Sequence, residues 1–152
     1  MYERQIDLMH EEALAIEKNA QKMASQLHEN WRATRLQADC SFSPRLKTTT
    51  DSAWISAHEG NNQVDIANTI FSELPRDWQR ENYLAALTAL ILVVNNPLAT
   101  LEQLAAEIHD AWLERNGWAK NDLKLGLPYA ELAEEEKDKD KAHITMAFAL
   151  LS

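Results

Sequence analysis

Residues 108–118 of this chain read IHDAWLERNGW, and residues 127–137 read LPYAELAEEEK. An earlier part of the chain repeats the core of both stretches. HENW at residues 28–31 repeats the His-acid-x-Trp pattern, and FSELP at residues 71–75 repeats the aromatic-x-Glu-Leu pattern. A strongly helical run follows each of the later stretches. The sequence therefore predicts one helix–connection–helix motif that is written twice.

The spacing of the two copies shows where they differ. Aligning Phe71 with Tyr129 requires a shift of 58 residues, whereas aligning His28 with His109 requires 81, so the first copy carries 23 extra residues between its parts. We expect a single domain over residues 1–152, with one half at about 20–95 and the other at about 98–152. The halves can bury their apolar faces against each other about a pseudo-two-fold axis, which makes the groove between them the default binding site.

Composition limits the class of protein. The chain has 152 residues, of which 45% are hydrophobic, and only three glycines and four prolines, so we expect a folded, mainly α protein. Its net charge of −9 argues against general binding to nucleic acid or anionic membranes. The single cysteine, Cys40, cannot form a disulfide within the chain, and neither a leader nor a membrane-spanning run is recognisable. We therefore expect a cytoplasmic location.

Apolar periodicity and capping residues predict five helices, at about residues 3–37, 52–58, 76–94, 101–115 and 133–150. Asp51 is the expected N-cap of the second, Thr100 and Gln103 form a capping box for the fourth, and Gly117 is the expected C-cap of the fourth. Short β segments are possible in the connections, such as residues 39–50. The last helix begins with charges at pairing distance, and these pairs favour a solvated face: Glu134–Lys137, Glu135–Lys139 and Asp138–Lys141.

An apolar stripe runs along the first predicted helix at alternating spacings of three and four residues. It comprises Ile6, Met9, Ala13, Ile16, Ala20, Met23 and Leu27. Two interpretations are open: a seam with a second copy of the chain, or packing against the chain's own helices. Alanines in the stripe, and the break in the pattern at Asn30, favour the second. A homodimer through this helix remains a possible partner arrangement.

The second copy resembles the RyR domain, the repeat first described in ryanodine receptors and also found in small bacterial and phage proteins. The resemblance rests on His109-x-x-Trp112, Asn116-Gly117-Trp118, Pro128-Tyr129-x-Glu131-Leu132 and the acidic, lysine-containing run at 134–140. The first copy matches through His28, Trp31 and residues 71–75, but Trp78 and Gln79 stand where the acidic run is expected. The resemblance implies a two-fold, helix-rich recognition module and not an enzyme. Sensing of nucleotide-like molecules is a proposal for its small microbial members.

The repeated residues allow two roles. His28 and Trp31, like His109 and Trp112, lie three residues apart and share a helix face, where they can stack on a flat ligand. The structural interpretation, which we favour, makes each tryptophan a core anchor and pairs each histidine with a backbone carbonyl. Glu73 and Glu131 are likewise expected to cap the following helices and not to act in chemistry.

A ligand site is predicted where basic and aromatic residues coincide. Its candidate residues are Arg32, Arg35, Arg45, Lys47, Trp54 and Trp118, and its ligand is a small anionic or nucleotide-like molecule. The alternative, favoured by the acidic composition, is that the basic side chains pair with the chain's own carboxylates. Because no glycine-rich phosphate loop, nucleophile elbow or metal-binding His pair is recognisable, we expect no catalysis, metal or cofactor. The alternative function is a protein-interaction or homo-oligomeric assembly module without a small-molecule ligand.

Overall fold

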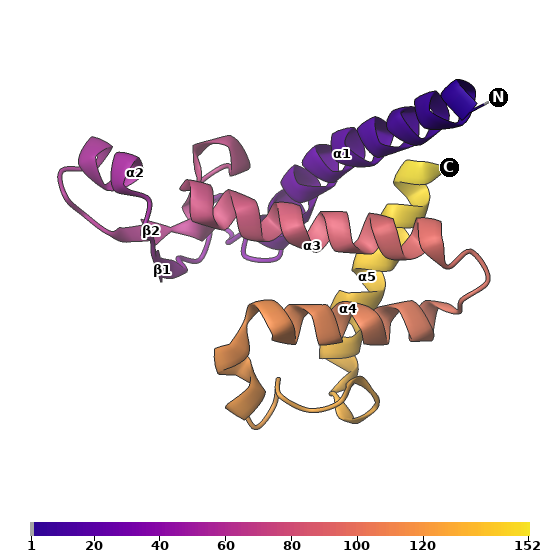
Figure 1. Cartoon of the computed structure of the whole chain (residues 1–152). Coiled ribbons are helices and arrows are strands. Elements are labelled where there is room, and N and C mark those ends of the chain that lie inside the picture. The colour runs from indigo at the N-terminus through magenta and orange to yellow at the C-terminus, as the bar shows by residue number, and fades with distance from the viewer. Residues whose placement is uncertain (1) are drawn as a thin grey trace. The chain divides into compact units, whose positions relative to one another are not determined.

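The computed structural model describes the backbone of residues 2–152 and the side chains from residue 10 onward. It is mainly helical, as the sequence predicts. Over the described residues there are five α-helices (Figure 1), namely α1 (Tyr2–Ala33), α2 (Ser52–Ala57), α3 (Arg76–Asn95), α4 (Leu101–Arg115) and α5 (Glu134–Leu151). Strands β1 (Leu46–Thr48) and β2 (Gln63–Asp65) pair antiparallel, with Lys47 opposite Val64. Four 3-10 turns lie in the connections: η1 (Ile66–Asn68), η2 (Phe71–Glu73), η3 (Gly117–Asn121) and η4 (Tyr129–Glu131).

Local capping chemistry fixes several helix ends where the sequence places them. The Asp51 carboxylate accepts the amides of Ala53 and Trp54 at the start of α2. Thr100 and Gln103 form both hydrogen bonds of a capping box at the start of α4. Each cap satisfies amides that have no partner within the helix, so these short-range signals suffice to set the helix starts.

One predicted helix end and one predicted cap are wrong. α1 ends at Ala33 and not at residue 37, because the amides of Thr34 and Arg35 bond the carbonyls three residues back and Leu36 pairs with Phe42 in an isolated β-bridge. Gly117 is not a left-handed C-cap. The C-cap of α4 is Asn116, at φ −120°, and Gly117 begins η3. The backbone amide and the side-chain amide of Asn116 both donate to the Trp112 carbonyl, so no left-handed residue is needed to satisfy it.

The chain divides into two compact units. The middle unit is Ala24–Leu84, and the terminal unit combines Met1–Met23 with Ala85–Ser152. The unit boundaries fall inside α1 and inside α3, so both helices contribute residues to both units. The pseudo-two-fold pairing of the two sequence halves stays a prediction.

In the terminal unit, α4 packs across α5 (Figure 1). The most buried apolar side chains of these two helices form their inner faces: Leu104, Ala105, Ile108, Ile144 and Ala147. Beside them, Ala105 packs with Tyr129 and Leu132, which joins η4 to the same core. Burial of these apolar side chains is the main favourable term that holds the unit together.

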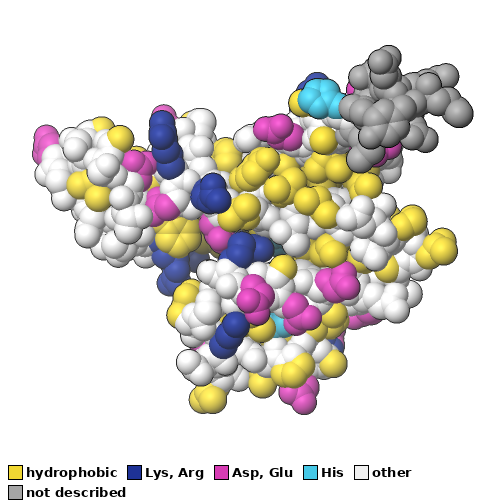
Figure 2. Space-filling view, viewed as in Figure 1, with side chains coloured by type: hydrophobic (Ala, Val, Ile, Leu, Met, Phe, Trp, Pro, Cys, Tyr) yellow, Lys and Arg dark blue, Asp and Glu magenta, His cyan; other side chains and the backbone are white. Residues whose placement is uncertain are grey.

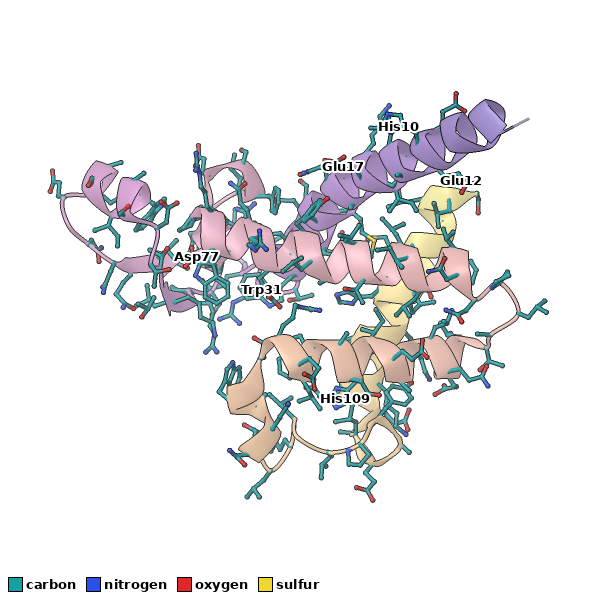
Figure 3. The ribbon with its side chains drawn as sticks, in the orientation of Figure 1. His10, Glu12, Glu17, Trp31, Asp77 and His109 are labelled. Atoms are coloured by element: carbon teal, nitrogen blue, oxygen red, sulfur yellow. The ribbon has the colours of Figure 1, made fainter. Side chains whose placement is uncertain are left out.

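In the middle unit, the β1–β2 hairpin is fastened to the start of α3. The Asp77 carboxylate, labelled in Figure 3, accepts the Thr49 hydroxyl at 2.7 Å and the Thr50 amide at 3.1 Å. The Trp78 indole N–H donates to the Thr48 carbonyl at 3.2 Å. Val64 is buried on the inner side of the hairpin. The hairpin is therefore held in a defined place on α3.

The apolar stripe of α1 is only partly covered. Ala20 and Met23 are fully buried, Ile16 and Leu27 are half-buried, and Ala13 is exposed. The predicted members Ile6 and Met9 lie outside the described side chains. Packing within the chain thus accounts for the later part of the stripe. Across the described residues, every helix is too short or too polar to cross a lipid bilayer.

Candidate functional site

Both repeated histidines form a hydrogen bond with a backbone carbonyl. The Nε2 atom of His28 lies 2.7 Å from the carbonyl oxygen of Thr69, and Nε2 of His109 lies 2.7 Å from that of Leu127. Thr69 and Leu127 each precede a 3-10 turn by two residues, and both histidines are 4% exposed. Because a carbonyl oxygen can only accept, each imidazole donates from Nε2. These contacts, here called the carbonyl anchors, are what the structural interpretation of the motif predicts.

The two tryptophans lie beside the anchors and not in the core. Trp31 stacks on His28 with ring centroids 5.9 Å apart, and Trp112 stacks on His109 at 6.4 Å. Both indoles are of intermediate burial, so they are largely covered, but neither belongs to the fully buried core. Each helix carries its tryptophan at the rim of the packed face, where one side of the ring covers the histidine.

The glutamates of the motif do not cap the following helices. Glu73 and Glu131 are exposed, and the first amide of α3, at Arg76, is accepted by Asp51 at 2.9 Å. The reason is distance along the chain, because each glutamate ends a 3-10 turn two residues before the position that a capping side chain would occupy. The aromatic residue of each turn does make a polar contact: Glu29 accepts the Phe71 amide, and Tyr129 donates its hydroxyl to Glu102 at 2.8 Å.

Two of the predicted ligand-binding arginines, Arg32 and Arg35, donate hydrogen bonds to backbone carbonyls of the middle unit. Arg32 donates from Nε to the Ala67 carbonyl at 2.8 Å, pairs with Glu29 at 2.6 Å and lies over the Phe42 ring. Arg35 donates to the carbonyls of Ser43 and Pro44 at 2.7 and 2.8 Å. Arg32 thus forms the ion pair that the acidic composition favours, whereas Arg35 binds carbonyls. Both guanidinium groups are therefore already engaged within the middle unit.

Arg45 and Lys47 are placed differently. Lys47 is the middle residue of β1, and Arg45 directly precedes the strand. Residues two apart in an extended chain point to the same side. Arg45 is exposed, and the Lys47 ammonium lies 5.7 Å from the centroid of the Trp78 ring. Burial, and after it the positive charge of Arg45, lower the pKa of Lys47. We call Arg45, Lys47 and Trp78 the cationic cluster.

The carboxylates that flank the cationic cluster are engaged elsewhere. Asp65 accepts the backbone amides of Arg45 and Ala67, and Asp77 accepts a hydroxyl and an amide from residues 49 and 50. The ion pairs among the described side chains include neither Arg45 nor Lys47. The cluster therefore presents two neighbouring positive charges without a paired carboxylate.

The two remaining predicted site residues, Trp54 and Trp118, have other ring neighbours. Trp54 stacks on His58 with ring centroids 3.8 Å apart, and its buried indole N–H has no acceptor among the described residues. Trp118 belongs to the terminal unit, is 64% exposed and contacts Trp112 edge-on at 6.0 Å. Sequence reasoning missed Trp78, because it entered only as a departure from the acidic run. Its contact with Lys47 is tertiary, and no local pattern reveals it.

The described side chains contain no group of three or more His, Cys, Asp or Glu residues that could hold a metal ion. No protein-family model, no curated protein and no solved structure matches this chain.

Proposed function

We propose that the chain is a non-catalytic recognition module, built from two RyR-like repeats, that binds a small anionic ligand at the cationic cluster. The two carbonyl anchors support the repeat interpretation, because both copies use the same histidine for the same purpose. The observation that carries the binding proposal is the pair of cations at Arg45 and Lys47, which have no paired carboxylate.

Charge explains why an anion fits there. Two like charges held close together disfavour each other, and an anion placed between them removes that cost. An arginine guanidinium can bind a phosphate or carboxylate through two parallel hydrogen bonds, and a lysine adds a compact charge. Trp78 offers an aromatic surface next to the charges, while Lys47 already covers part of its ring. A phosphate-bearing molecule with a flat ring suits this combination.

The cluster is preorganised. The Arg45 amide donates to Asp65 at 3.0 Å, and the Arg45 carbonyl accepts the Ile66 amide at 2.9 Å. Together with the Trp78–Thr48 contact, these bonds fix the strand before any ligand arrives, so little ordering is required on binding. The cluster supplies charge and an aromatic face, and neither a nucleophile nor a general base. Recognition is therefore the proposed role.

Replacing Arg45 with alanine tests the proposal. We expect adenosine monophosphate, titrated at constant ionic strength, to raise the melting temperature of the unaltered protein, since a ligand at 100 times its Kd adds about 2.7 kcal/mol. Arg45→Ala is expected to abolish this response while leaving the ligand-free melting temperature nearly unchanged, because the side chain is exposed. Arg80→Ala removes another exposed arginine of the same unit and is the matched control. An intact response in Arg45→Ala would refute the site.

A second candidate function is protein interaction or homo-oligomeric assembly through the terminal unit. Several of its large apolar side chains are exposed, among them Leu14, Ile91, Val94 and Phe148. Figure 2 shows hydrophobic side chains gathered in a broad field on the visible face. Contiguous apolar surface of this kind marks interaction sites. Sedimentation of the protein at high concentration distinguishes a homodimer from a monomer.

A further inference from the structure

In the second carbonyl anchor, the Asp140 carboxylate lies next to the free ring nitrogen of His109. His109 lies on α4, where Figure 3 labels it, and its Nδ1 atom is 3.9 Å from Oδ2 of Asp140 on α5. The side chains are 5% and 15% exposed respectively, so solvent screens this contact weakly. The separation is too long for a hydrogen bond, but it brings the two groups within range of strong electrostatic coupling.

The anchor determines which atom can exchange a proton. Because Nε2 of His109 donates to the Leu127 carbonyl, its hydrogen stays in place, and the variable position on the ring is Nδ1. With a proton on Nδ1, a positive ring faces the Asp140 carboxylate. With a proton on Asp140, an acid faces the nitrogen lone pair. With neither, a lone pair faces a buried carboxylate, which is the unfavourable arrangement.

The neighbours of the pair are few and mostly committed. On α5, Glu136 and Lys139 are the other charged groups that act on Asp140, and they pair with each other at 3.0 Å. On η4, burial is the main cause that raises the pKa of Tyr129, and the charge of Asp140 is one of the smaller causes. The Tyr129 hydroxyl donates to Glu102, and Glu102 also pairs with Lys141.

The more distant charged groups around α4 interact with residues other than His109 and Asp140. Lys120 of η3 pairs with Glu114 at 3.3 Å. His143 of α5 forms a hydrogen bond with the carbonyl of Lys139. Burial, and to a smaller extent the positive charge of Arg115, lower the pKa of His143. Their effect on the His109–Asp140 pair is therefore secondary.

The first copy of the motif lacks this feature. A shift of 58 residues, which aligns the two 3-10 turns, places Asn82 at the position of Asp140. Burial lowers the pKa of His28, and its charged neighbours Glu29 and Arg32 oppose each other. The same histidine is thus a fixed anchor in one copy and is coupled to a carboxylate in the other.

We propose that His109 and Asp140 form a proton-operated latch in the terminal unit. While the pair holds a proton, it fastens α5 to α4 and, through Leu127, to the connection that leads into η4. Loss of that proton places a lone pair against a carboxylate and loosens the first turns of α5. The latch is a regulatory device that is independent of the cationic cluster.

The direction of the pH effect follows from Asp140. Burial, only partly offset by His109, raises the pKa of this carboxyl to about 6. A carboxyl whose pKa is higher in the folded than in the unfolded chain binds its proton more tightly when folded, so it stabilises the fold at low pH. That contribution is complete below the ordinary value of 3.8 and is lost as the pH rises through about 6. The latch therefore opens as the pH rises from 3.8 through about 6.

Hydrogen exchange tests the latch. Between pH 5 and pH 7.5, protection factors of amides in residues 138–144 are expected to fall about tenfold, the size of one pKa unit of coupling. In Asp140→Asn, the fall should be absent, because the replaced side chain cannot titrate. Asp138→Asn removes an exposed carboxylate from the same helix and should behave like the unaltered protein. Constant protection in the unaltered protein, or an unchanged fall in Asp140→Asn, would overturn the latch.

A second measurement needs no variant and covers the case in which Asp140→Asn does not fold. Carbon chemical shifts report the protonation of the Asp140 carboxyl, and nitrogen chemical shifts report whether His109 Nδ1 carries a proton. In a coupled pair, both shifts change over the same pH range, because the steps belong to the pair and not to either residue. Shifts that change in separate pH ranges, each unaffected by the other group, would show that the groups do not act as a latch.

Discussion

Replacing Gly126 with alanine is expected to lower the free energy of unfolding by about 3 kcal/mol, as overpacking of a closely packed site does. An added Cβ atom would lie 2.8 Å from the Ala119 carbonyl oxygen and closer still to that of Lys120. Both atoms belong to the backbone of η3, so no side-chain rotation can relieve the contact. Urea unfolding, followed by circular dichroism, measures the loss.

Gly117→Ala is the matched control in the same connection. No atom lies within 4 Å of the Cβ position at Gly117, and its φ is not in the left-handed region. Alanine there should be neutral or should stabilise by about 0.4–1 kcal/mol, because it restricts the unfolded chain. Equal losses for the two variants would contradict the close approach of Gly126 to η3.

Replacing either histidine of the carbonyl anchors with alanine is also expected to lower the free energy of unfolding strongly. His28→Ala or His109→Ala should each lower the free energy of unfolding by about 3 kcal/mol, because each change leaves a carbonyl without its donor and opens a cavity beneath a tryptophan. The two losses should be similar, since both histidines are 4% exposed and make the same contact. His10→Ala, on the exposed side of α1, should change stability by less than about 0.5 kcal/mol. A small loss for one anchor would mean that the copies differ.

Short-range chemistry explains which parts of the fold are predictable from the sequence. The starts of α2 and α4 depend on side chains within three residues of the helix, and both are predicted correctly. The last residue of α4, Arg115, is predicted correctly, but its C-cap is predicted wrongly, because Asn116 satisfies a carbonyl that Gly117 was expected to satisfy. The requirement for glycine at position 126 depends on the backbone of residues 119 and 120, and no local pattern reveals it.

The charged run at the start of α5 shows the same limit. Glu134 and Lys137 pair at 3.5 Å as predicted, because residues three apart lie on one helix face. Lys139 pairs with Glu136, and Lys141 pairs with Glu102 of α4, in place of the predicted partners. Once α4 packs against α5, a carboxylate from another helix becomes available, and periodicity within one helix cannot show this.

The candidate site was predictable in its residue types but not in their roles. Arg32 reaches a carbonyl 35 residues away in the sequence, and Arg35 reaches one that is eight residues away. Only tertiary structure decides that these arginines are engaged while Arg45 and Lys47 are not. The sequence did identify the histidines as partners of backbone carbonyls, because a histidine beside a tryptophan on a helix face is usually buried and hydrogen-bonded.

The repeated carbonyl anchor is the feature on which the two-copy interpretation depends, and the tautomers of the histidines test it most directly. A long-range proton–nitrogen correlation spectrum distinguishes Nε2–H from Nδ1–H imidazoles. His28 and His109 should show the Nε2–H form, whereas His58 and His143, whose Nδ1 atoms lie 2.7 and 2.8 Å from carbonyls one turn back, should show the Nδ1–H form. A neutral imidazole with its proton on Nδ1 and none on Nε2, at His28 or His109, would show that the anchor is not repeated.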